Sequence, residues 1–236
     1  MSATSHLPEN LAQLDRETDR LVRDVAAMDD AAVRQASRCE GWTRAHVISH
    51  VARNADGLAN LAHWALTGER REQYASPESR DADIEDGSRR GAAELLADLR
   101  ESAERFGALA RRLPGEAEEA RVEARGGRTM RGRDLVTARL REVVFHHVDL
   151  DCGFGFADAE PGFVQRAVNE SVRRLGAADP QLALVLQEPG GEQVAVLGAG
   201  GQVVTGTPAD LLMWLARGDG SGVSSDRPLP SLPAWG

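Results

Sequence analysis

The sequence predicts an α plus α/β protein, in which a four-helix bundle precedes a small α/β domain with a short three-stranded sheet and two helices. Two observations predict this class. Apolar residues recur every three or four positions in long segments of the first part of the chain, as in amphipathic helices. Later, short apolar runs alternate with glycine-rich turns, as in short strands. We therefore expect two domains, residues 1–155 and 156–236.

The helices of the first domain are expected from their apolar stripes and end signals. Thr43 is a favourable N-cap for the second helix, and Gly68 can end it. Pro114 stops the third helix, and Gly126-Gly127 is expected to turn a short hairpin before the fourth. The four expected helical segments are residues 11–28, 43–67, 92–113 and 132–150.

Residues 69–88, by contrast, are polar and show no apolar period. This stretch is long for a connection, so we expect a loop that is either functional or flexible.

The elements of the second domain follow in a different order. Pro161 suits the first turn of a helix that Gly176 would stop. The runs LALVLQ, QVAVL and QVVTG are expected to be three strands. Thr207-Pro208 begins a last helix, and the Gly/Ser/Pro-rich residues after it are expected to be irregular.

Composition and charge exclude several functional classes. The chain has 28 basic residues, all of them Arg, against 37 acidic ones, and its net charge is −9. An acidic surface repels phosphate backbones, which argues against a general nucleic-acid binder. The absence of Lys excludes lysine Schiff-base chemistry. With no apolar stretch long enough for a membrane span and no signal peptide at the start, we expect a cytoplasmic protein that makes no membrane contact.

Pairs of potential metal ligands lie one helical turn apart on two of the helices. His46 and His50 are on the second helix, and Glu142 and His146 are on the fourth. Side chains at i and i+4 share one face and can share a metal ion. On a helical wheel His50 lies nearer the apolar stripe than His46 does, so His50 is expected nearer the bundle interior.

Both pairs also have simpler interpretations. His50 could be a partly buried histidine with an ordinary hydrogen-bond partner. The polar side chains of the fourth helix could form a solvated face, because Arg139, Glu142, His146 and Asp149 lie within about 80° of one another. The two cysteines, Cys39 and Cys152, have no evident activating neighbours, and we expect inert thiols.

Several segments resemble the mycothiol-dependent maleylpyruvate isomerase family. They are CEGWTRAHVISHVARNADGLANLAHWALTGE (39–69), YASPESRDADIEDGS (74–88), REVVFHHVDL (141–150) and GTPADLLMWLARGDGSGV (206–223). The resemblance implies a DinB-like four-helix bundle, a small α/β domain and one zinc ion held by His50, Glu142 and His146. It also implies a functional role for Arg217, where the preceding Ala216 departs from the Gly that the family often has.

The reaction that the resemblance implies is the isomerisation of maleylpyruvate to fumarylpyruvate in the gentisate pathway of aromatic degradation. Mycothiol would bind zinc as a thiolate, add to the double bond and leave after rotation. Arg217 could bind a substrate carboxylate or mycothiol, or could simply be a cation favoured at a helix C-terminus. Asp149 could orient a ligand imidazole or cap the helix end, and a carboxylate is disfavoured at that end.

Two alternatives remain open. A mycothiol S-transferase would use the same zinc site on another electrophile, and a non-catalytic binding module would use the metal for stability alone. We expect maleylpyruvate and mycothiol as the small-molecule partners of a monomeric protein.

Overall fold

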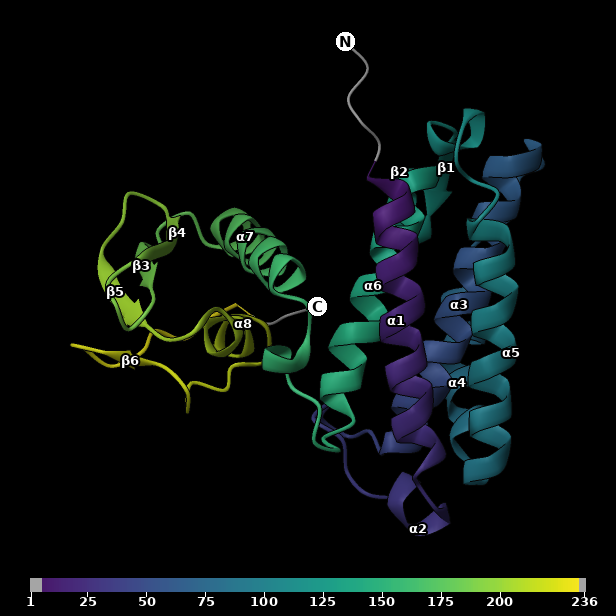
Figure 1. Cartoon of the computed structure of the whole chain (residues 1–236), viewed down its shortest axis with the longest axis horizontal. Helices are drawn as coiled ribbons and strands as arrows, with labels where there is room; N and C mark the ends of the chain where they lie inside the picture. The colour runs from purple at the N-terminus through teal and green to yellow at the C-terminus, as the bar shows by residue number, and fades with distance from the viewer. Residues whose placement is uncertain (1–5, 234–236) are drawn as a thin grey trace. The chain divides into compact units, whose positions relative to one another are not determined.

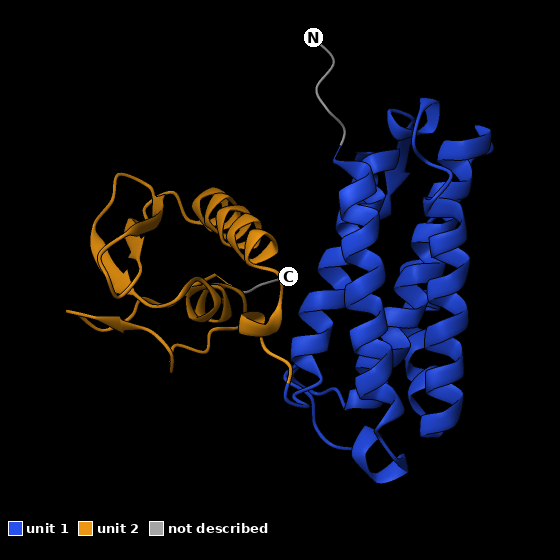
Figure 2. Cartoon of the chain, in the orientation of Figure 1, with its two compact units in different colours: residues 1–153 blue, residues 154–236 orange. Residues whose placement is uncertain are grey.

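The computed structural model describes residues 6–233 and divides into two compact units, residues 1–153 and 154–236 (Figure 2). Each unit is described by itself. Within the described residues, no helix combines the length and the apolar character that crossing a membrane requires.

The first unit is a bundle of four long helices, as expected (Figure 1). Helices α1 and α3 each pack against both α5 and α6, and the shorter α4 packs against α3. The core between them is apolar, with large, fully buried side chains such as Leu21, Ile48, Leu99, Phe106 and Leu135. The helices of this unit are α1 (Leu7–Ala26), α2 (Asp30–Val33), α3 (Arg44–Thr67), α4 (Pro77–Ser88), α5 (Ala92–Ala110) and α6 (Gly132–Asp149).

Helix α3 begins and ends where local chemistry predicts. Thr43 has the extended backbone of an N-cap, and its backbone N–H donates to His46 Nδ1 at 3.2 Å. At the other end Gly68 has a φ of 76°, and its N–H donates to Trp64 O at 2.8 Å. Glycine adopts this left-handed conformation without steric cost. Both predicted ends of the helix are confirmed.

Helix α4 contradicts the expectation of a loop over residues 69–88. Ser76 and Ser79 cap its start reciprocally, each hydroxyl accepting the other residue's backbone N–H at 3.0 Å, and Pro77 occupies the first turn. Its large buried apolar side chain is Ile84, so the sequence shows no helical stripe. Packing relies on small residues instead, because a Cβ at Gly87 would lie only 2.1 Å from Ser49 Oγ of α3.

A short hairpin of β1 (Arg121–Ala124) and β2 (Arg128–Arg131) leads into α6, and the predicted glycine turn joins its strands. Gly126 and Gly127 both have a φ of 75°. Short 3-10 turns occupy Glu116–Glu118, Arg125–Gly127 and Phe156–Asp158.

The second unit packs two helices with a small mixed sheet. In the strand order β4-β3-β5-β6, β5 runs parallel to β3 and the other neighbours are antiparallel. The expected sheet had three strands. The added β6 was missed because two polar residues show no period, and Ser225 Oγ attaches it by donating to Val203 O at 2.6 Å. The elements are α7 (Pro161–Ala178), β3 (Leu184–Gln187), β4 (Gln193–Leu197), β5 (Gln202–Thr205), α8 (Pro208–Arg217) and β6 (Ser224–Ser225).

Helix α7 also differs from the expectation, since it continues through Gly176 to Ala178. Gly176 does not end the helix. A Cβ at this position would lie 2.9 Å from Leu197 Cδ1, so the glycine lets β4 approach the helix closely.

Candidate metal centre

The packing of α3 against α6 brings His50, Glu142 and His146 together. Glu142 Oε2 lies 3.1 Å from His50 Nε2 and 3.5 Å from His146 Nε2. The two imidazole rings meet edge to face, with centroids 4.5 Å apart. One ligand atom from each of the three residues lies within 4.8 Å of the other two. Two nitrogens and a carboxylate oxygen therefore converge on a single point.

The three side chains are partly shielded from solvent, with exposed fractions of 8% for His50, 23% for Glu142 and 17% for His146. Burial and the charge of His146 lower the pKa of His50 to about 4. Burial acts to raise the pKa of Glu142, but hydrogen bonds with His146 and His50 outweigh it and hold this pKa well below its ordinary value. At neutral pH His50 is neutral and Glu142 is ionised, as metal ligands must be.

His146 is oriented by Asp149, which is completely buried. Nδ1 of His146 and Oδ2 of Asp149 are 2.8 Å apart. Because a carboxylate can only accept, Nδ1 carries the proton and Nε2 is directed at Glu142. Burial lowers the pKa of His146, but hydrogen bonds with Asp149, Cys39 and Glu142 outweigh it and raise this pKa well above its ordinary value. A carboxylate behind a histidine is the usual support of a metal-binding imidazole.

Arg80 of α4 contacts the other histidine. Its Nη2 lies 3.0 Å from His50 Nδ1, and its guanidinium carbon lies 5.8 Å from the centroid of the Tyr74 ring. Arginine only donates, so Nδ1 accepts and Nε2 of His50 carries the proton that faces Glu142. Coordination through Nε2 would move that proton to Nδ1 and turn Arg80 away. The sequence carried no signal for Arg80, because it lies in the segment that was expected to be a loop.

The donor set fits a divalent ion of the zinc type. Two histidines and one glutamate are a common ligand set for catalytic zinc, and they leave a coordination position open. The expectation that His50 faces the bundle interior is met, since it is buried. His46 lies apart from the ligand set and serves α3, because its Nδ1 accepts at the N-cap and its Nε2 lies 3.2 Å from Glu85.

Cys39 lies closer to this centre than the sequence indicated. Its sulfur lies within 4.8 Å of a ring nitrogen of His146 and a carboxylate oxygen of Asp149. The loop before α3 brings it there by folding back, with a β-bridge between Ala36 and Thr43. Trp42 of the same loop packs beside His50, with ring centroids 5.6 Å apart. Loop geometry of this kind leaves no periodic signal in a sequence.

Arg139 is a buried part of α6 and does not lie on a solvated face. It is 1% exposed, and its Nη1 donates to Val51 O at 2.7 Å and to Asn54 Oδ1 at 2.9 Å on α3. Burial lowers its pKa to about 10, against the opposing effect of the Glu142 charge. The guanidinium therefore joins the two helices directly beside the candidate ligands.

Arg217 belongs to the second unit. It is the last residue of α8, where its Nη1 donates to Ala216 O at 2.9 Å. Gly218 follows with a φ of 72° and ends the helix.

Comparison with known proteins gives a consistent result. Residues 14–151 match the family model of the mycothiol maleylpyruvate isomerase N-terminal domain. The chain is similar to the crystal structure of a mycothiol-dependent maleylpyruvate isomerase, with 32% identity, 97% of each chain covered and a TM-score of 0.89. A mutant of that enzyme matches with 31% identity, the same coverage and the same TM-score.

A more distant structure shows the fold alone. YfiT from Bacillus subtilis, a probable metal-dependent hydrolase with an unusual four-helix bundle topology, matches with 19% identity and a TM-score of 0.52. The match covers 64% of this chain and 86% of that one. No curated protein sequence matches the chain significantly.

Proposed function

The chain belongs to the mycothiol maleylpyruvate isomerase family, and from this premise we propose that it converts maleylpyruvate to fumarylpyruvate with mycothiol as the thiol. The observation that supports the proposal most directly is the convergence of His50, Glu142 and His146. We further propose that these residues hold zinc, and that residues 1–155 form the metal-binding domain. The reaction would serve the gentisate pathway in the cytoplasm.

A bound zinc ion would supply a Lewis acid at the open coordination position, where it stabilises a thiol as its thiolate. His50 and His146 would each offer Nε2 to it, and Glu142 would offer Oε2. Asp149 holds the proton on Nδ1 of His146 and keeps this ring in place. By holding the ion, these residues would fix where the mycothiol sulfur binds, and the charge of the ion would keep that sulfur deprotonated.

The isomerisation itself needs no net change in electrons. A carbon–sulfur bond forms at one alkene carbon, and the electron pair of the double bond moves toward the conjugated carbonyl group. The remaining single bond rotates. The carbon–sulfur bond then breaks, and the double bond returns in the trans configuration.

Two arginines are suited to the carboxylates of the substrate. Arg80 lies against His50 and has a planar guanidinium, which binds carboxylates with two hydrogen bonds. Arg217 is the residue that family resemblance assigns to substrate or mycothiol. We propose that Arg217→Ala leaves the zinc content intact and lowers turnover, whereas unchanged turnover would make Arg217 a helix-end cation only.

The test is the rate of maleylpyruvate loss by the zinc-loaded protein, with and without mycothiol, with fumarylpyruvate identified as the product. We expect conversion that requires mycothiol and one zinc ion at the His50, Glu142 and His146 centre of each chain. His50→Ala should lose the ion at this centre and the activity, while His63→Ala, a matched change further along α3, should keep both. Zinc-loaded protein that binds mycothiol without converting maleylpyruvate would favour the S-transferase. Bound zinc with no effect of any thiol would favour a binding module.

A further inference from the structure

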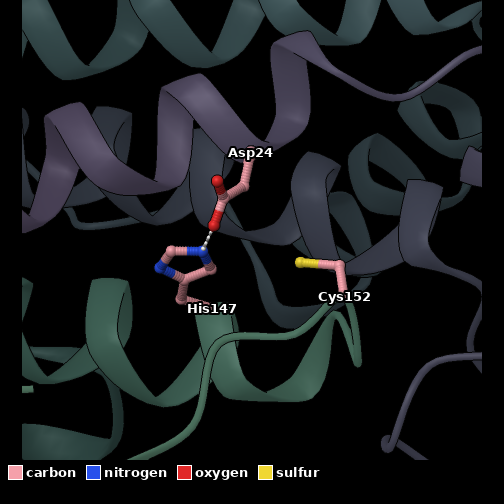
Figure 3. A group of neighbouring side chains, drawn as sticks. All are labelled: Asp24, His147 and Cys152. Carbon is pink, nitrogen blue, oxygen red and sulfur yellow. Dashed lines mark hydrogen bonds and ion pairs between the residues drawn. The ribbon is translucent and has the colours of Figure 1, made fainter. Parts of the chain in front are cut away.

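A second group of metal-binding side chains lies in the first unit, outside the candidate metal centre. It consists of Asp24 from α1, His147 from α6 and Cys152 from the turn that follows α6 (Figure 3). One ligand atom from each residue lies within 4.8 Å of the other two. The sulfur of Cys152 points toward the His147 ring and the Asp24 carboxylate in Figure 3. An oxygen, a nitrogen and a sulfur therefore converge.

The contacts within the group place its atoms well for an ion. His147 Nε2 and Asp24 Oδ2 are 2.7 Å apart. The His147 side chain is 1% exposed and the Asp24 side chain is 46% exposed, while Cys152 is partly buried. The imidazole is thus held firmly by the protein, and the carboxylate gives access from solvent.

The last turn of α6 contributes one histidine to this group and one to the candidate metal centre, on different faces of the helix. His146 and His147 are consecutive, so their side chains point about 100° apart around the helix. His146 faces His50 of α3, and His147 faces Asp24 of α1. Because α6 packs against both of these helices, the two groups remain separate.

The turn that carries Cys152 is fixed independently of any ion. Arg44 donates to the carbonyl oxygens of Leu150 and Asp151, each at 2.5 Å. Arg38 pairs with the Asp151 carboxylate at 2.7 Å. Asp151 has a φ of 50°, which turns the chain back sharply after α6. The thiol is therefore presented by a preformed turn, which lowers the entropic cost of binding an ion.

We propose that Asp24, His147 and Cys152 form a second divalent-metal site, selective for borderline-soft ions such as zinc. Thiolate and imidazole ligands favour zinc, whereas magnesium and calcium need sites made of oxygen ligands. The ion would replace the thiol proton of Cys152 and the proton that His147 Nε2 donates to Asp24. The imidazole proton would move to Nδ1, so that one proton leaves per ion bound. The fourth position would be taken by water.

Binding of Co²⁺ at this site can be measured by absorption, because a thiolate ligand gives Co²⁺ an intense near-ultraviolet charge-transfer band. The full chain would carry His50→Ala and Glu142→Gln to disable the first centre, and Cys39→Ser to remove the other thiol. We expect this variant to bind one Co²⁺ per chain with the charge-transfer band. Adding Cys152→Ser should abolish the band, and adding Asp24→Asn should weaken binding.

The control is Asp19→Asn, the same substitution at an exposed position of α1, which should leave Co²⁺ binding unchanged. The proposal would be overturned if the band survives Cys152→Ser, or if the starting variant shows no band at saturating Co²⁺. Asp24 and His147 would then be a hydrogen-bonded pair that holds no ion. Circular dichroism shows whether the Cys152→Ser variant folds. If it does not, Co²⁺ binding by the Asp24→Asn variant tests the proposal, and unchanged binding would overturn it. Because turnover is not measured, this test is independent of the proposed isomerase activity.

Discussion

Replacing Asp149 by Asn tests whether the carboxylate behind His146 supports a metal ligand. The Asp149 side chain is 0% exposed, and its Oδ2 lies 2.8 Å from His146 Nδ1. Asn keeps the size and a hydrogen-bond acceptor but removes the charge. A hydrogen bond to a charged group is worth about 1.5–3 kcal/mol and a neutral one about 0.5–1.5 kcal/mol. The difference between the two, about 1–1.5 kcal/mol, corresponds to roughly tenfold weaker zinc binding.

Asp149→Ala should be more damaging, because Nδ1 of the His146 ring then loses its partner altogether, and a loss of zinc affinity approaching about 100-fold is expected. The dissociation constant of zinc would be measured by competition with a chromophoric chelator. Asp151→Asn is the matched control, because it removes the same charge only two residues further along the chain. The Asp151 side chain is 54% exposed and pairs with Arg38. Zinc affinity that is unchanged in Asp149→Asn, or reduced equally in Asp151→Asn, would refute the reasoning.

Two further predictions follow from the same structure. Zinc occupancy should fall as the pH falls through the raised pKa of His146, because protons and the ion compete for Nε2, whereas His50, with a pKa of about 4, protonates later. Zinc content measured after equilibration across this range checks it, and full occupancy down to pH 4 would contradict it. Gly87→Ala should destabilise the fold by about 1–3 kcal/mol, because its Cβ would collide with Ser49. Gly107→Ala, also inside a helix but near only a flexible side-chain end, should instead stabilise it by about 0.5–1 kcal/mol, and equal urea midpoints for the two variants would count against this packing.

Local chemistry made much of the bundle predictable. Thr43 and Gly68 set the two ends of α3 through capping and a left-handed glycine, and both effects act within one helical turn. The same holds for the placement of Glu142 and His146 on one face of α6, because helical spacing alone requires it. Helix α4 could not be predicted from local sequence, because its packing depends on Gly87 fitting against Ser49 and not on an apolar stripe.

The amino-acid sequence by itself determined the four long helices of the bundle, both ends of α3 and the placement of the candidate ligands Glu142 and His146 on one face of α6. Only the tertiary structure decided that His50 meets this pair, because the meeting depends on how α3 packs against α6. It also brought Arg80 and Cys39 beside the two histidines, and Asp24 and Cys152 beside His147. These contacts join positions far apart in the chain, and the free energy that creates them comes from burying the whole core, so no local pattern records them.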